Sequence, residues 1–153
     1  MKSNLKNLIN KLVIDMSKRS IVELKLPAIP DIELAATKTS EIVAKHMKLS
    51  EEKSAEINMA LIEACINAFE HSKSKKDIYI KFIVDEESLT IKVIDKGVGF
   101  DKSKVKIPNI EKKLKNKRKR GWGLKLINEL MDSVEWESSE KGTTVTMKKM
   151  KKL

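Results

Sequence analysis

Hydrophobic residues recur along the chain with two spacings, one typical of helices and one typical of strands. Spacings of three and four predict helices over residues 4–16, 32–47, 51–71 and 124–131. Alternation of apolar and polar residues predicts strands over residues 20–26, 78–84, 89–95, 134–137 and 143–147. Because the strands are joined mainly as hairpins, this order predicts an α+β fold: a two-layer sandwich with helices on one face of a mixed, mostly antiparallel sheet.

The chain divides into an N-terminal amphipathic helix, within residues 1–19, and one domain over residues 20–153. The length of 153 residues suits a single core. An isolated helix as short as the first one is marginal in water unless its apolar face is packed. We therefore expect it to dock on its own domain or to form a dimer or partner contact. Its apolar stripe comprises Leu5, Leu8, Ile9, Leu12, Val13 and Met16.

The next two helices are predicted from their caps and apolar stripes. Asp31 is expected to cap the first of them, and Ser50 the second, where Glu51 and Glu52 add negative charge at the helix start. The inward positions of the first are predicted to be Ile32, Ala35, Thr39, Ile42, Val43 and Met47. Those of the second are predicted to be Ala55, Met59, Ile62, Ile66 and Phe69.

Composition and charge narrow the possible functions. The net charge of +10 could indicate nucleic acid, but much of the excess lies in residues 112–120 and 148–152, and aromatic residues are only 4%. Nucleic acid is therefore not the expected partner. No apolar run reaches the roughly 18 to 20 residues that span a bilayer, and no secretory signal is present. The single cysteine, Cys65, cannot form an internal disulfide, and this favours the cytoplasm.

Three polar residues follow one another at helical spacing in the third helix. Glu63, Asn67 and His71 are four residues apart, and their stripe is displaced by one residue from the predicted core stripe. They would border the core rather than face open water. Two interpretations remain open from the spacing alone: a functional site, or ordinary polar residues on the solvent side.

Asp95 is in phase with the apolar residues of its strand, so its carboxylate is predicted to face the buried side of the sheet. A buried carboxylate needs a hydrogen-bond donor, and an adenine amino group is a suitable one. Gly97 and Gly99 follow it, and glycines allow a flat ligand to approach the backbone closely. The alternative is a hairpin-end turn with an exposed aspartate.

A second glycine pair opens the last helix. The run Arg120-Gly121-Trp122-Gly123-Leu124 places two glycines where backbone N–H groups of a helix start can bind phosphate oxygens. Such a pair is also common in ordinary loops, but its position after the Asp95 run favours the nucleotide interpretation. We interpret Trp122 as a packing residue or a partial lid.

These three segments, together with Gly142-Thr143-Thr144-Val145, resemble the N-box, the two glycine boxes and the terminal GT element of the Bergerat-fold (GHKL) ATPases, in the same order. The resemblance extends from about residue 20 to 150. Within that superfamily, residues 63–71 and 120–132 are most similar to the anti-sigma-factor serine/threonine kinases. Histidine kinases fit less well, because the first helix contains no phosphoacceptor histidine.

The resemblance implies a role for each motif residue. Asn67 would be the Mg²⁺ ligand, Asp95 the adenine-binding residue, and Glu63 the general base that takes the proton from a partner's hydroxyl. Residues 100–120 would form the ATP lid. The remaining residues that would contact ATP are His71, Gly97, Gly99, Arg120, Gly121, Gly123, Leu124 and Thr144.

The function implied is that of an ATP- and Mg²⁺-dependent serine/threonine kinase and anti-sigma factor. Such a protein phosphorylates a STAS-type anti-anti-sigma protein and sequesters a sigma factor, and a homodimer is expected. Two departures from the family pattern put the partner's identity in doubt: the added first helix, and the run from Leu34 to Lys38 where an arginine is often found. The alternatives are a nucleotide-dependent binding switch without phosphoryl transfer, and a kinase that regulates a phosphatase or a signalling scaffold.

Overall fold

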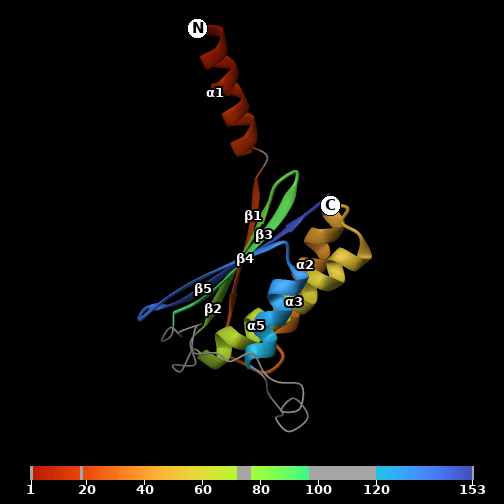
Figure 1. Cartoon of the computed structure of the whole chain (residues 1–153), viewed down its shortest axis with the longest axis vertical. Coiled ribbons are helices and arrows are strands. Elements are labelled where there is room, and N and C mark those ends of the chain that lie inside the picture. The colour runs from red at the N-terminus through yellow and green to blue at the C-terminus, as the bar shows by residue number, and fades with distance from the viewer. Residues whose placement is uncertain (1, 18, 72–76, 97–119, 153) are drawn as a thin grey trace.

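The computed structural model describes residues 2–17, 19–71, 77–96 and 120–152. Its elements follow the predicted order, with helices α1 (Lys2–Ser17), α2 (Glu33–His46), α3 (Glu51–His71) and α5 (Arg120–Leu130). The strands are β1 (Ser20–Leu26), β2 (Ile78–Val84), β3 (Ser88–Asp95), β4 (Ser133–Ser139) and β5 (Gly142–Met150). Figure 1 shows α2, α3 and α5 on one side of the sheet, with α1 standing away from both layers. The α+β prediction is confirmed.

The five strands lie in the order β1-β2-β3-β5-β4, and all four pairings are antiparallel. The prediction of a mixed sheet was therefore wrong in that detail. Strands that run in the same direction, such as β1 and β3 or β3 and β4, are always separated by an intervening strand. The last strand of the chain is inserted between β3 and β4.

The β2–β3 turn shows how local sequence sets the register. The carboxylate of Asp85 accepts hydrogen bonds from the backbone N–H groups of Glu87 and Ser88, both at 2.8 Å, and from the Ser88 hydroxyl at 3.0 Å. Partial desolvation raises the pKa of Asp85, but these hydrogen bonds and the nearby charge of Lys148 outweigh it, so the pKa is lowered overall. This turn holds the hairpin that ends at Asp95.

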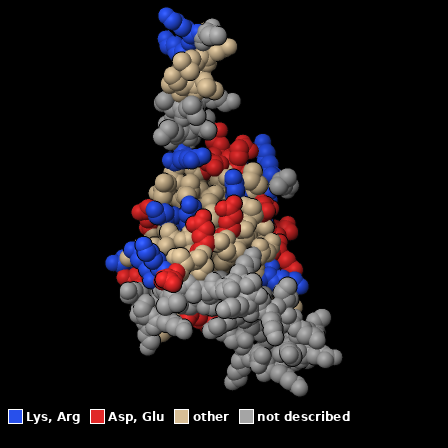
Figure 2. Space-filling model, turned by 60° about the vertical axis from the view of Figure 1, so that its left-hand side comes forward, with Lys and Arg blue, Asp and Glu red and all other residues tan. Residues whose placement is uncertain are grey.

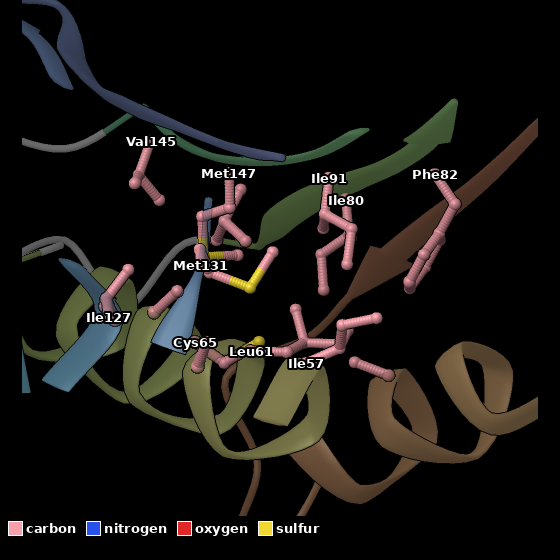
Figure 3. Close-up of a cluster of buried hydrophobic side chains, with 14 of the residues drawn as sticks. Ile57, Leu61, Cys65, Ile80, Phe82, Ile91, Ile127, Met131, Val145 and Met147 are labelled. Carbon is pink, nitrogen blue, oxygen red and sulfur yellow. The ribbon is translucent and has the colours of Figure 1, made fainter. Parts of the chain in front are cut away.

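The core lies between the sheet and the inner faces of the three covering helices. Alternate residues of β2 and β3 are fully buried, as their period of two predicted. Small residues of α3, including Ala60 and Ala64, face the sheet, and this allows the helix to lie close to it. The side chains that meet across the two layers in Figure 3 include Ile57, Leu61, Cys65, Ile80, Phe82, Ile91, Ile127 and Met147.

The predicted inward faces of α2 and α3 were only partly right, because Val43, Met47, Ile32 and Phe69 contact the core but the other predicted positions do not belong to it. In α3, Ala55 and Met59 are exposed and Ile62, Ile66 and Phe69 are only half-buried. In α2, Ile42 is 71% exposed and Ala35 is exposed, whereas Val43 and Met47 are buried as predicted. Some of the larger apolar residues of these two helices, such as Ile42 and Met59, lie on the outer sides of the helices. The buried positions are Ala36, Thr37, Ser40, Val43 and Ala44 in α2, and Ile57, Ala60, Leu61, Ala64, Cys65, Asn67 and Ala68 in α3.

The two predicted helix caps had different outcomes. Ser50 accepts a hydrogen bond from the backbone N–H of Lys53 at 3.1 Å, as an N-cap residue does. Asp31 does not cap α2, because it adopts a left-handed backbone conformation with φ of 63° and the N-cap position falls on Ile32. None of the helices in the described ranges is long and apolar enough to cross a membrane.

Candidate functional site

The adenine half of the candidate site is built by the ends of β3 and β5. Asp95 is the last residue of β3 and is only 4% exposed, so the predicted inward phase is confirmed. It pairs in register with Thr143, which is also buried. Both residues line a narrow pocket between the sheet and α3. The Asp95 pocket is formed by Ala64, Asn67, Ala68, Val93, Asp95, Trp136, Thr143 and Val145.

Gly142 fixes the backbone beside Asp95. Its φ of +137° is a conformation that residues with a side chain rarely adopt. A Cβ atom at this position would lie 2.1 Å from the backbone carbonyl oxygen of Asp95 and 2.9 Å from Cα of Lys96. The strand that carries Thr143 can therefore approach the end of β3 only because residue 142 is glycine.

Thr144 lies on the other face of the sheet, which corrects its predicted place. Since side chains alternate along a strand, Thr143 faces the Asp95 pocket and Thr144 faces away from it. Thr144 instead lines a polar hollow on the uncovered face, together with Lys96, Glu137 and Lys141. The residue of the GT element that faces Asp95 is thus Thr143.

The phosphate half of the candidate site lies where α3 meets α5. A Cβ atom on Gly123 would lie 2.8 Å from Oε2 of Glu63 and 3.4 Å from Nδ2 of Asn67. The glycine-containing first turn of α5 therefore rests directly against the Glu63 and Asn67 side chains. These two residues border the core on the side of α3 that faces α5, and Asn67 also lines the Asp95 pocket. Asn67 thereby connects the two halves.

Asn67 has the property expected of a ligand-binding group. Its side chain is 5% exposed, and its Nδ2 atom has no hydrogen-bond partner within the described part of the chain. A buried amide without a partner costs about 1–3 kcal/mol, which a ligand oxygen would recover. Its Oδ1 atom is the type of oxygen that Mg²⁺ accepts, alongside phosphate oxygens.

Only some of the remaining predicted site residues lie within the part of the chain that the structure describes. Leu124 is buried, and its carbonyl oxygen accepts a 2.8 Å hydrogen bond from Nδ2 of Asn128. Arg120 and Gly121 form the start of α5, as predicted, but the Arg120 side chain lies outside the described residues. The side chain of His71, at the end of α3, and both Gly97 and Gly99 also lie outside them.

Two residues of the pocket were missed by the sequence analysis, Thr143 and Trp136. The alternation of residues along β4 and β5 could have identified both. Trp136 is in phase with Val134, which packs against the core, and Thr143 is in phase with Val145 and Met147. Cys65 lies on the same helix as Asn67, but burial and, to a lesser extent, the charge of Glu33 raise the pKa of its thiol to about 12, so it is unreactive.

Comparison with known proteins agrees with this geometry. The histidine kinase-like ATPase domain family matches residues 27–149. Serine-protein kinase RsbW of Bacillus mycoides (strain KBAB4) is 34% identical over 140 residues, which cover 88% of this chain and 87% of the relative. The chain belongs to the RsbW family of serine-protein kinases. RsbW of Bacillus cereus (strain Q1) matches with the same identity and coverage.

Two solved structures share the fold of this RsbW-family chain. The RsbU and RsbW domains of Rv1364c from Mycobacterium tuberculosis match with a TM-score of 0.63 and 17% identity, covering 86% of this chain and 32% of that one. The SiaB–SiaC complex from Pseudomonas aeruginosa matches with a TM-score of 0.57 and 9% identity, and the match covers 98% of this chain and 99% of the matched chain. At these identities the likeness bears on the fold alone. The family membership implies that this chain binds ATP.

Proposed function

We propose that this RsbW-family kinase transfers the γ-phosphoryl group of ATP to a serine or threonine of a STAS-type anti-anti-sigma protein in the cytoplasm. When that antagonist is unavailable, the kinase binds and sequesters a sigma factor. The observation that carries this proposal is the meeting of Glu63 and Asn67 with Gly123, beside the pocket that buries Asp95. The names of the RsbW relatives support the kinase part of the proposal.

Asp95 would hold the adenine. Its carboxylate can accept a hydrogen bond from the adenine amino group, and Val93, Val145 and Ala68 supply the apolar walls that a flat ring needs. Because the carboxylate is buried, a base without the amino group would lose this hydrogen bond at a place where water cannot readily replace it. Thr143, next to Asp95 across the β3–β5 pair, can add a hydroxyl to the same end of the ring.

Asn67 would bind Mg²⁺ through Oδ1 and a phosphate oxygen through Nδ2. A divalent cation neutralises the charge of the phosphates, and Mg²⁺ commonly takes only one or two protein ligands besides the nucleotide and water. Within the described ranges there is no cluster of three His, Cys, Asp or Glu residues that could hold a metal ion. A single amide with a buried unpaired nitrogen fits this mode of binding.

Glu63 would accept the proton of the acceptor hydroxyl. Its carboxylate lies one helical turn before Asn67 and faces the first turn of α5, where backbone N–H groups can bind the transferring phosphate. A base in this position orients the hydroxyl and removes its proton, and it does not contribute to adenine binding. Nucleotide affinity and phosphoryl transfer therefore depend on different residues.

The test is the substitution Glu63→Gln, with ATP binding measured by calorimetry and transfer measured with labelled ATP and a STAS-type antagonist. We expect unchanged ATP affinity and a rate lower by about 10²- to 10⁴-fold, the usual contribution of a general base. Glu52→Gln, an exposed position in the first turn of α3, is the matched control and should behave as the unchanged chain. A normal rate for Glu63→Gln would show that the base assignment is wrong. A folded, ATP-binding chain that never phosphorylates the antagonist would favour a binding switch.

We further propose that the protein forms a homodimer and that α1 contributes to its contacts. Leu5, Leu8 and Ile9 of α1 are between 49% and 60% exposed in the single chain. Figure 2 shows α1 projecting beyond the rest of the molecule. An amphipathic helix of this length needs a packed apolar face.

A further inference from the structure

Six of the nine large apolar side chains that are exposed among the described residues lie before residue 30. Besides Leu5, Leu8 and Ile9 of α1, they include Ile21, which is 59% exposed, Val22 on the same strand, and Ile29 in the segment that follows β1. They belong to three consecutive segments: α1, the edge strand β1, and the connection from β1 to α2. Scattered apolar residues are ordinary, but six within α1, the edge strand β1 and the segment that follows it indicate a contact surface.

The two edges of the sheet differ in their protection. On β4, Glu135 and Glu137 are exposed, and charged side chains of this kind discourage pairing with another strand. The β1 edge carries the apolar Ile21 and Val22 in its first half. Its outer side has no strand partner among the residues that the structure describes, since β1 pairs only with β2. β1 also carries two exposed charges, Glu23 and Lys25, but they have opposite signs, so this edge can pair with a second copy of itself, whereas the two glutamates of β4 would repel.

We propose that β1 pairs antiparallel with β1 of a second copy of this chain, across a two-fold axis at Leu24, so that the two sheets become continuous. This inference rests on the homodimer of the proposed function and specifies its interface. The partner is identified by the strand's own sequence, because Ser20–Leu26 is complementary to itself in charge and in side-chain face.

The register follows from which side chains share a face. In β1, Val22, Leu24 and Leu26 lie in register with the buried residues Phe82, Ile80 and Ile78 of β2, so these three face the helices, while Glu23 and Lys25 face the uncovered side. If Leu24 pairs with itself, every residue meets one of the same face. Glu23 then lies opposite Lys25 of the partner subunit, and Lys25 opposite the partner's Glu23.

Other two-fold registers of the same strand are less favourable. Centring the axis on Glu23 places two glutamates opposite each other, and centring it on Lys25 does the same with two lysines. Like charges directly opposite destabilise an antiparallel pair. Centring it on Val22 places Ile21 opposite the partner's Glu23 and gains no ion pair. The Leu24 register is the one that forms two Glu–Lys pairs.

The same arrangement gives α1 a place to dock. The strands run in opposite directions, so the Ser20 end of one β1 lies beside the Leu26 end of the other. Figure 1 shows α1 continuing beyond the Ser20 end of β1. It would therefore lie beside the partner's segment after β1, which carries the exposed Ile29. One two-fold axis then accounts for the apolar residues of all three segments.

A charge-reversal series in the full-length chain tests the interface, with the dimer dissociation constant measured by analytical ultracentrifugation. Glu23→Lys and Lys25→Glu should each raise that constant by roughly tenfold, because each converts two attractive pairs into two repulsive ones. The double variant restores both pairs and should return to within about threefold of the unchanged chain. Lys92→Glu, on the central strand β3, is the matched control and should have no effect on dimerisation.

The double variant also separates the interface from contacts within one chain. Glu23 lies 3.4 Å from Nζ of Lys81, and Nζ of Lys25 lies 3.5 Å from Oδ2 of Asp77. In the double variant both of these intrachain pairs stay repulsive, so a recovered dimer can come only from pairing between subunits. Single variants that dimerise normally, or a double variant that is as weak as the singles, would overturn the β1 register.

Leu8→Asp, at an exposed position of α1, should weaken the dimer by about tenfold if this helix packs on the partner. An equally tight dimer would overturn the place assigned to α1. A chain that is monomeric at all concentrations would overturn the whole inference. Phosphoryl transfer to the antagonist is measured in the same samples. Activity in a monomeric variant would show that the proposed kinase function holds even where the dimer inference fails.

Discussion

The two halves of the proposed nucleotide site are built by different means. At the adenine half, Asp95 and Thr143 are placed by strand register, and the backbone of Gly142 touches that of Asp95. At the phosphate half, Glu63 and Asn67 are side chains on one helix that meet the first turn of another. Backbone contacts in a sheet leave little freedom to adjust, whereas side chains between helices can rotate. We therefore expect substitutions at the adenine half to affect folding and those at the phosphate half to affect rate.

The largest effect should come from breaking the backbone contact of the adenine half with Gly142→Ala. The added methyl would overlap the Asp95 carbonyl, and the φ of +137° is strained for alanine, so the free energy of unfolding should fall by about 2–4 kcal/mol. Urea denaturation measures this. Thr144→Ala, one residue later and on the outer face, should cost less than about 1 kcal/mol. Equal effects of the two substitutions would show that the close approach at Gly142 is not required.

The next substitution, Asp95→Asn, sharpens the comparison by changing chemistry without changing shape. An amide in place of the carboxylate mispairs one buried hydrogen bond to adenine, so ATP binding should weaken by about 1–3 kcal/mol. Calorimetry gives the affinity, and circular dichroism checks that the variant is folded. If a folded Asp95→Asn chain binds ATP as tightly as before, Asp95 is not the adenine anchor.

The smallest effect should come from Gly123→Ala in the phosphate half. Its methyl would lie 2.8 Å from Oε2 of Glu63, a flexible group that can move aside, so phosphoryl transfer should slow by about tenfold. Alanine is the better helix former by about 1 kcal/mol, so the free energy of unfolding should stay the same or rise. A loss of stability as large as that of Gly142→Ala would contradict the distinction between the two halves.

The sequence predicted features that depend on neighbouring residues in the chain. The order of elements, the Ser50 cap and the inward phase of Asp95 were all read from local patterns, and all are confirmed. Strand phase was reliable because a period of two allows only two choices of face. The same argument can be applied to the GT element. An inward Asp95 opposite residue 143 requires Thr143, not Thr144, to face the pocket.

The helix faces could not be predicted by the same route. α3 carries apolar residues around most of its circumference, and the larger ones, such as Met59 and Ile62, suggested the core stripe. The buried face of α3 instead combines the large Ile57 and Leu61 with small residues such as Ala64 and Ala68, which allow close approach. The proximity of Gly123 to Glu63 could not be predicted from the sequence either, because it depends on how two helices distant in sequence pack against each other.

The insertion of β5 between β3 and β4 has a consequence for how the chain is made. Residues 142–150 are synthesised after the other described strands, yet they lie between β3 and β4 and supply Thr143 to the Asp95 pocket. Until they leave the ribosome, β3 lacks its second neighbour and β4 has none. Such a long-range pairing forms late in folding. The Asp95 pocket therefore cannot be completed before residues 142–150 have left the ribosome, although Asn67 and Asp95 are synthesised much earlier.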